Sequence, residues 1–168
     1  MKSFAFPIHI GELNGTPVGD LRLIASDEGL IAVEWADRQP DFDSYLMPFE
    51  PDTIAPYADE LREYLEGKRR EFTFQVHWDI FRPFQRAALQ AVFKIPYGET
   101  RTYSEIATEI KRPLAYRAVG RANATNPMPL VIPCHRLIGT DGKLHGYGGG
   151  EGLKTKEWLL KMEGAVIA

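Results

Sequence analysis

The chain has 168 residues, of which 44% are hydrophobic and 26% charged, a composition typical of a globular protein with a buried core. No apolar run approaches the roughly 20 residues that a membrane-spanning helix needs, and the first residues lack the apolar segment of a secretory leader. Its one cysteine, Cys134, can form neither an internal disulfide nor a cysteine pair for zinc. We therefore expect a cytoplasmic protein in a reducing environment, with no membrane partner, no metal and no other cofactor.

The net charge of −3 conceals two halves of opposite sign. Residues 1–80 carry 7 Lys or Arg against 16 Asp or Glu, and residues 81–168 carry 13 against 7, so the balances are −9 and +6. A basic half joined to an acidic half indicates that one half meets a polyanion. Uneven surface charge without any partner explains the count equally well.

The first half alternates hydrophobic and polar residues with the period of β-strands. Turn sequences at 14–19 and 26–29 predict an antiparallel meander, with strands at 3–10, 19–26 and 29–36. We predict a polar loop at 38–56, a helix within 56–70 that ends at Gly67, and a fourth strand at 71–78. Residues 1–80 are thus predicted to form a small sheet with a helix.

From about Phe81 the hydrophobic period becomes helical. We predict helices at 82–95, 102–110, 114–124 and 153–164, and a glycine-rich loop at 139–150 that lacks the spacing of a phosphate-binding loop. Thr102 and Glu105 have the spacing of a capping box. The first and last of these helices are expected to bury Phe84, Leu89, Val92, Phe93, Leu153, Trp158, Leu159 and Met162.

The helices at 102–110 and 114–124, joined by a short break, have the outline of a helix-turn-helix. The second helix is rich in Ala and Gly, which lets its backbone approach another surface closely. It also carries Arg117 and Arg121 one turn apart on the same face. Residues 101–136 hold six Lys or Arg and two Asp or Glu. The pattern predicts either DNA binding or plain helix packing.

The sequence LVIPCHRLIG at 130–139 surrounds the single thiol. A free cysteine is usually a small buried apolar residue, and it becomes a nucleophile only beside a base or a positive charge. His135 is adjacent, but successive side chains of a straight strand point to opposite faces, so pairing requires the irregular backbone that Pro133 favours. Glu163 could orient the imidazole, completing a nucleophilic relay.

The motif IPCHR, followed by GYGGG and then KEWLL, resembles the O6-alkylguanine-DNA alkyltransferases. The resemblance extends upstream and covers nearly all of residues 81–168, but residues 1–80 only loosely. It implies an α/β (α+β) fold: a ribonuclease H-like domain at 1–80, then a mainly helical domain with a helix-turn-helix at 81–168. It also implies direct-reversal DNA repair, in which one chain transfers one alkyl group, such as methyl, from O6-alkylguanine to Cys134, with O4-alkylthymine as a second candidate substrate.

The resemblance also assigns roles to individual residues. Cys134 accepts the alkyl group, His135 acts as its base through a bridging water, Glu163 orients His135, and Asn126 supports the turn that holds the thiol. Arg117 enters the base stack where the flipped nucleotide has left. The expected substrate pocket comprises Tyr103, Pro129, Leu137, Tyr147 and Gly148. The expected contacts to double-stranded DNA comprise Tyr116, Arg117, Ala118, Gly120 and Arg121.

Several positions depart from the family's usual pattern: Phe81, Arg82, Arg121, His145 and the extra Glu151-Gly152. The main alternative is a non-catalytic protein of the same fold that only binds alkylated DNA. A cysteine hydrolase unrelated to DNA and a helix-turn-helix regulator are further alternatives. We expect a monomer, with self-association on DNA left open.

Overall fold

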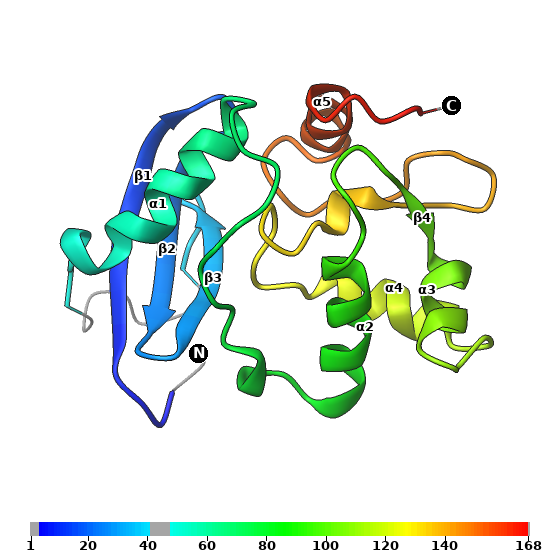
Figure 1. The fold of residues 1–168 in the computed structure, drawn as a ribbon, viewed down its shortest axis with the longest axis horizontal. Helices are drawn as coiled ribbons and strands as arrows, with labels where there is room; N and C mark the ends of the chain where they lie inside the picture. Colours follow the sequence, from blue (N-terminus) through cyan, green and yellow to red (C-terminus); the bar gives the residue numbers. More distant parts are fainter. Residues whose placement is uncertain (1–3, 41–47, 168) are drawn as a thin grey trace. The chain divides into compact units, whose positions relative to one another are not determined.

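The computed structural model describes residues 4–40 and 48–167, and the chain divides into two compact units, Met1–Ile80 and Phe81–Ala168 (Figure 1). Both units combine helices with short strands, which gives the mixed α/β fold expected from the sequence. Within the described ranges, none of the helices is both long and apolar enough to cross a membrane.

The first unit is a three-stranded antiparallel sheet covered by one helix. Strands β1 (Ile8–Thr16), β2 (Gly19–Ser26) and β3 (Gly29–Trp35) pair in sequence order, and α1 (Pro51–Leu65) packs against β1 and β2 (Figure 1). The side chains between the sheet and α1 form a buried hydrophobic core that includes Leu13, Leu21, Leu23, Ile54, Leu61 and Leu65. The meander is confirmed.

The bounds of β1 and α1 differ from the prediction at both ends. Strand β1 continues to Thr16, beyond the predicted end at residue 10, so that only Pro17 and Val18 remain in the turn. Helix α1 begins at Pro51, inside the predicted loop, because proline is favourable in the first turn of a helix, where its missing N–H is not needed. Pro56 therefore lies inside the helix. Residues 41–47 of the predicted loop lie outside the described residues.

The predicted fourth strand at 71–78 is wrong. The segment keeps the alternating burial of a strand, but it meets β3 only at an isolated bridge between Leu30 and Val76. The backbone N–H of Thr73 donates instead to the carboxylate of Glu60 on α1, at 2.8 Å. The alternation of buried and exposed side chains is therefore as predicted, but the backbone N–H of Thr73 bonds to the Glu60 side chain and not to a neighbouring strand.

The second unit is mainly helical. Helices α2 (Pro83–Phe93), α3 (Tyr103–Glu109) and α4 (Tyr116–Ala124) pack on one another, and α5 (Leu153–Met162) contacts the turn that contains Cys134 (Figure 1). A two-residue strand β4 (Arg101–Thr102) pairs in parallel with β5 (Leu137–Ile138). This pairing, which the sequence did not predict, places the start of α3 beside the chain that follows the thiol.

The predicted capping box at Thr102 is confirmed. The Thr102 hydroxyl accepts the Glu105 N–H at 3.1 Å, and the Glu105 carboxylate accepts the Thr102 N–H at 2.7 Å. Helix α3 is short, so the two bonds satisfy a large share of its free N–H groups. They fix the direction in which α3 leaves β4, and with it the place of Tyr103.

The predicted buried faces of α2 and α5 are partly wrong. Leu89, Val92 and Leu159 are buried as expected, whereas Phe84 and Met162 are only half-buried. Three other predicted core residues are substantially exposed, namely Phe93 at 38%, Leu153 at 47% and Trp158 at 37%. Helix α5 buries Thr155, Lys156, Leu159 and Leu160 instead, because the amine of Lys156 finds buried carbonyl acceptors that the sequence pattern cannot show.

Candidate active site

Cys134 starts a single 3-10 turn, Cys134–Arg136, directly after Pro133. Pro133 adopts φ −78° and ψ 64°, and the Cys134 N–H donates to the carbonyl of Ile132 at 2.7 Å. The backbone at the thiol is therefore irregular, as expected, and not a strand. Cys134 is 6% exposed and His135 is completely buried, so the turn brings both side chains into the interior of the second unit.

Asn126 holds the loop that leads to this turn. Its side-chain amide donates to the carbonyl of Ile132 at 3.0 Å, and its side-chain oxygen accepts the Met128 N–H at 2.9 Å. Between these two points Leu130 adopts a left-handed backbone with φ +75°, a conformation that costs a leucine free energy and needs external support. Asn126 thus bonds to the loop that leads to the turn with the thiol, and its role in supporting that turn stays a prediction.

His135 and Glu163 form a buried pair. Nε2 of His135 lies 2.8 Å from Oε1 of Glu163, and neither side chain is accessible to solvent. An ionised carboxylate can only accept, so Nε2 carries the hydrogen and Nδ1 is the basic nitrogen. Burial lowers the pKa of His135 despite the neighbouring carboxylate, so the imidazole is neutral and able to take a proton near pH 7.

Arg136 completes this group, although the sequence analysis gave it no role. Its Nε and Nη2 donate to the two oxygens of Glu163, both at 2.9 Å. Burial alone would raise the pKa of Glu163, but the hydrogen bonds from His135 and Arg136 outweigh burial and hold that pKa far below its ordinary range. Glu163 is therefore an ionised carboxylate with both oxygens fixed.

The adjacent His135 and the nearby backbone dipoles predict a thiolate at Cys134, and the structure differs from this prediction. Burial raises the pKa of the thiol, although the Asn126 hydrogen bond, the charge of Lys156 and the local backbone N–H groups act in the other direction. The expectation that the free protein favours a thiolate is therefore wrong: the resting group is a thiol. The adjacent His135 is neutral, and its role as the base that takes the thiol proton stays a prediction.

Lys156 is a second residue that the sequence analysis missed. It is completely buried on α5, and its amine donates to the carbonyls of Leu137 at 2.6 Å and His145 at 2.8 Å. Burial lowers its pKa to about 8, while attraction to Cys134 opposes the shift. The amine thereby ties the strand after the thiol to the glycine-rich loop. The sequence does not show this role, because the two carbonyl acceptors come together only in the folded chain.

The expected pocket residues lie around the thiol to different degrees. Tyr103 and Tyr147 are close enough to Cys134 that the charge of the ionised thiol would add to burial in raising the pKa of both phenols. Pro129 is half-buried, Gly148 is exposed, and Leu137 is completely buried as part of the core. The placement of all five residues in a substrate pocket stays a prediction.

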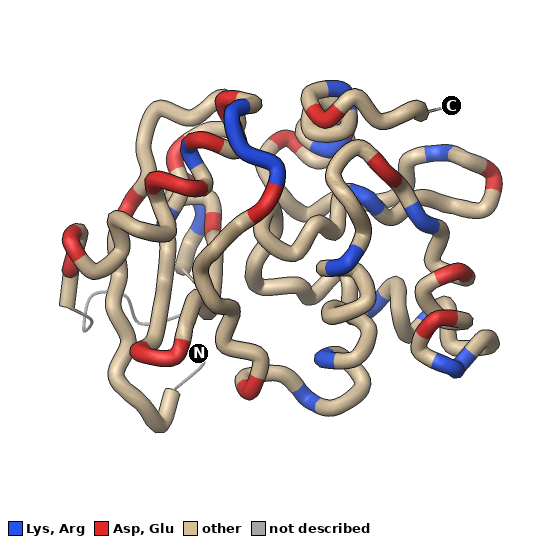
Figure 2. The backbone as a smooth tube through the Cα atoms, viewed as in Figure 1, with Lys and Arg blue, Asp and Glu red and all other residues tan. Residues whose placement is uncertain are grey.

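The expected DNA-contact residues lie on α4. Arg117 and Arg121 are exposed, and the Arg117 guanidinium lies over the Tyr116 ring at 5.7 Å from its centroid. Gly120 faces Tyr103, since a Cβ atom there would come within 3.9 Å of the phenol ring, and Ala118 is half-buried. Figure 2 shows the Lys and Arg positions of this unit, which outnumber its Asp and Glu positions. Contact with DNA stays a prediction.

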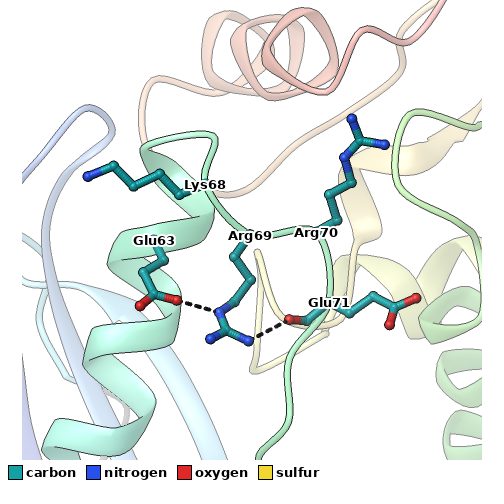
Figure 3. Close-up of a pocket in the computed structure, with 5 residues that line it drawn as sticks. All are labelled: Glu63, Lys68, Arg69, Arg70 and Glu71. Carbon is teal, nitrogen blue, oxygen red and sulfur yellow. Dashed lines mark hydrogen bonds and ion pairs between the residues drawn. The ribbon is translucent and has the colours of Figure 1, made fainter.

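The first unit contains two other groupings of charged side chains. A hollow of about 520 Å³ is lined by Glu63, Lys68, Arg69, Arg70 and Glu71 (Figure 3). In it, Arg69 donates to the Glu63 carboxylate at 2.7 Å and to the Glu71 carbonyl at 3.2 Å, so its charge is already satisfied within the protein. Glu28, His77 and Asp79 offer ligand atoms within 4.8 Å of one another, but two of these residues are exposed carboxylates, which are common without a metal. We assign neither grouping a function.

The structure divides into two compact units, and the second combines a buried free cysteine with a helix-turn-helix in a part of the chain rich in Lys and Arg. Comparison with known proteins gives the same division into two units. The 6-O-methylguanine DNA methyltransferase models match this chain in both units, the DNA binding domain over residues 83–165 and the ribonuclease-like domain over residues 12–78. This chain therefore belongs to the 6-O-methylguanine DNA methyltransferase family.

Individual relatives cover most of the chain. The inducible methylated-DNA–protein-cysteine methyltransferase of Bacillus subtilis is 46% identical over 130 residues, which cover 77% of this chain and 70% of that protein. The methylated-DNA–protein-cysteine methyltransferase of Methanosarcina barkeri is 38% identical over 161 residues, with 88% and 92% coverage. The crystal structure of Mycobacterium tuberculosis O6-methylguanine methyltransferase superimposes with a TM-score of 0.81 at 35% identity, with 94% and 93% coverage. A structure of the M. tuberculosis OGT in complex with DNA gives a TM-score of 0.79 at 36% identity, with 93% and 92% coverage.

Proposed function

We propose that this chain repairs alkylated DNA by transferring the alkyl group from O6 of guanine to Cys134, once per chain. The observation that carries the proposal is the buried Cys134 thiol next to a neutral His135 whose Nε2 is fixed by Glu163 at 2.8 Å. The family membership supplies the substrate class, since relatives that match this chain are named methylated-DNA–protein-cysteine methyltransferases.

The reaction balances with these residues alone. The thiol proton passes to Nδ1 of His135, the sulfur bonds to the alkyl carbon, and the carbon–O6 bond breaks with its electron pair left on guanine. The guanine anion then takes up one proton from water, the His135 imidazolium releases its proton to water, and the base is restored. Glu163 stabilises the imidazolium that forms, because the carboxylate is held ionised beside it. The thioether on Cys134 has no low-barrier route back, so the chain is consumed.

The substrate has to be presented outside the duplex. An alkyl group on O6 is enclosed by stacked bases, so the nucleotide must be extruded, at a cost of a few kcal/mol. We assign Arg117 to the vacated place in the stack and Tyr103 with Tyr147 to the extruded base. The exposure of Arg117 on α4 and the nearness of both tyrosines to Cys134 support this assignment.

The remaining expectations belong to the same proposal. The partner is double-stranded alkylated DNA, which the match to a DNA binding domain over residues 83–165 supports. We propose that the protein acts as a monomer in the cytoplasm, where a reducing environment keeps its one cysteine as a thiol. Light scattering with and without duplex DNA measures the oligomeric state and any self-association on DNA.

A titration of O6-methylguanine duplex with increasing protein tests the proposal. Repaired DNA should equal the protein added up to an equivalence point at one protein per lesion, and then remain constant. Binding without restored guanine would support the non-catalytic alternative. Repair of many lesions per chain would exclude transfer to Cys134. Hydrolysis of a chromogenic ester without DNA would support the hydrolase, and preference for one undamaged sequence would support the regulator.

A further inference from the structure

Arg136 is the residue immediately after the proposed base, yet its side chain points to the same carboxylate that the base contacts. Arg136 is 7% exposed, and its guanidinium donates three ways: to Oε2 of Glu163 at 2.9 Å, to Oε1 at 2.9 Å, and to the Ile95 carbonyl at 2.6 Å. Oε1 is also the oxygen that His135 uses. One carboxylate thus joins the imidazole to the guanidinium.

The turn between α2 and β4 closes around this pair. Gly98 donates its backbone N–H to Oε2 of Glu163 at 3.2 Å, and it adopts φ +80° with so little room that a Cβ atom would lie 2.9 Å from the Glu163 carbonyl oxygen. The ring of Tyr97 lies 5.8 Å from the Arg136 guanidinium, and its hydroxyl donates to the Met162 carbonyl at 3.4 Å. Oε2 therefore has two donors, and Oε1 has two.

We propose that Arg136 is a positioning residue for alkyl transfer, which fixes both oxygens of Glu163 and so keeps His135 in the orientation and the neutral state that let it take the thiol proton. The inference rests on the proposed function for its consequence in repair, but not for its geometry. Arg136 is not required to touch the DNA or the alkyl group.

The guanidinium acts by geometry and by charge. Its planar fork matches two carboxylate oxygens at once, which a lysine ammonium cannot do. Its positive charge opposes protonation of the imidazole. The charged groups that face His135 are Glu163, Arg136 and Lys156: burial lowers the pKa of His135, Glu163 acts to raise it, and the two cations act to lower it. Without the Arg136 charge, the carboxylate would hold a proton on His135 more firmly.

Two substitutions separate these contributions. Arg136→Gln removes the charge and the fork, and Arg136→Lys keeps the charge but loses the fork. The single-turnover rate of methyl transfer from O6-methylguanine duplex is measured from pH 5 to 9, with DNA saturating so that binding does not limit the rate. Arg101→Gln is the matched control, because Arg101 belongs to the same unit and forms an exposed ion pair with Glu99 at 2.8 Å.

The wild-type rate should fall only below pH 6.5, the ordinary pKa of histidine, because His135 resists protonation. In Arg136→Gln the plateau should also be about tenfold lower, because the fork is lost, and the acidic limb should move up by about one pH unit, which adds a roughly tenfold loss on that limb alone. Arg136→Lys should keep the wild-type midpoint with a plateau about tenfold lower, since only orientation is lost. Arg101→Gln should match the wild type. An equal, pH-independent loss in both Arg136 variants would reduce Arg136 to a structural role and overturn the inference.

A measurement on the unmodified chain covers the case in which Arg136→Gln does not fold. Nitrogen NMR shifts of the His135 ring should show a neutral Nε2–H tautomer at pH 7 that titrates below 6.5. A charged ring at pH 7, or an Nδ1–H tautomer, would contradict the inference. This result does not depend on repair: a wild-type chain that transfers no methyl group while its ring behaves as stated would refute the proposed function alone.

Discussion

Nε2 of His135 and Oε1 of Glu163 lie 2.8 Å apart although 28 residues separate them in the sequence, and both side chains are inaccessible to solvent. The two residues should act as a unit. His135→Ala and Glu163→Gln should each slow methyl transfer by 100-fold or more, roughly the usual contribution of a general base, and the double variant should be little slower than the more damaging single one. Single-turnover kinetics on O6-methylguanine duplex measures all three.

The control is the pair Glu157 and Lys161 on α5, the helix that Glu163 follows. Their side chains form an ion pair at 2.7 Å but are exposed to solvent. Replacing either with alanine should leave the transfer rate within about twofold, because exposed pairs contribute little. If the losses of transfer rate in the two single variants multiply in the double variant, His135 and Glu163 act independently. Glu163 would then be only the residue at the end of α5.

Stability should depend on pH through Glu163. Its pKa in the folded chain lies far below the ordinary 4.5, so the carboxylate contributes stability above pH 4.5, and this contribution is lost as the pH falls towards the folded pKa. Glu163→Gln, which leaves the buried Arg136 charge without its partner, should cost about 3–5 kcal/mol at pH 7.

The difference between wild type and Glu163→Gln should narrow below pH 4.5, since only the wild type then loses stability through this group. Urea unfolding at a series of pH values from 7 to 3 measures the difference. A gap of constant size across the series would mean that the ionised carboxylate is not what stabilises the second unit.

The thiol itself and its proposed partners could be predicted from the sequence because they lie in short, specific motifs. The capping box at Thr102 was equally readable, since it depends on two residues three apart. Arg136, Lys156 and Gly98 could not be found in this way. Their roles come from carbonyl and carboxylate partners between 11 and 65 residues distant, which only the folded chain brings together.

The fold, like the site, could be predicted where the signal is local in the sequence and not where it depends on distant contacts. Alternation predicted three strands, but whether the fourth segment paired with a neighbour depended on Glu60 of α1 taking the Thr73 N–H. The face of α5 was misjudged because a buried lysine is unfavourable unless its amine finds acceptors, and those acceptors lie on other segments. The raised pKa of Cys134 was also missed, because burial is a property of the packed site and not of neighbouring residues in the sequence.

The alkylated protein should be less stable than the free protein. Cys134 is buried in a turn that follows a loop held by Asn126 and containing the left-handed Leu130, so an added carbon has little room. Overpacking of this kind costs typically about 1–3 kcal/mol. Thermal unfolding before and after complete methylation measures the cost, and an unchanged Tm would show that the site has space to spare.

Arg117 and Arg121 should differ although both are exposed on α4. Arg121→Ala should weaken binding to all duplexes alike and flatten the slope of log affinity against log salt by about one unit, as expected for one lost phosphate contact. Arg117→Ala should slow repair in duplex more than it weakens binding to undamaged DNA. Its defect should shrink when the lesion lies opposite a mismatch, because extrusion costs less there.

Salt titrations and single-turnover repair of matched and mismatched duplexes measure both variants side by side. The same salt slope, together with the same indifference to mismatches, would make both arginines phosphate contacts. Arg117 would then have no place in the vacated base stack.

The central claim is that Cys134 itself receives the alkyl group. Mass spectrometry of the protein after incubation with excess O6-methylguanine duplex tests it most directly, with peptide mapping to locate the added mass. The wild type should gain one methyl group per chain, on the peptide that contains Cys134, and Cys134→Ser should gain none while still binding the duplex. A wild-type chain that binds the lesion without gaining a methyl group, or a methyl group found on any other residue, would contradict the account.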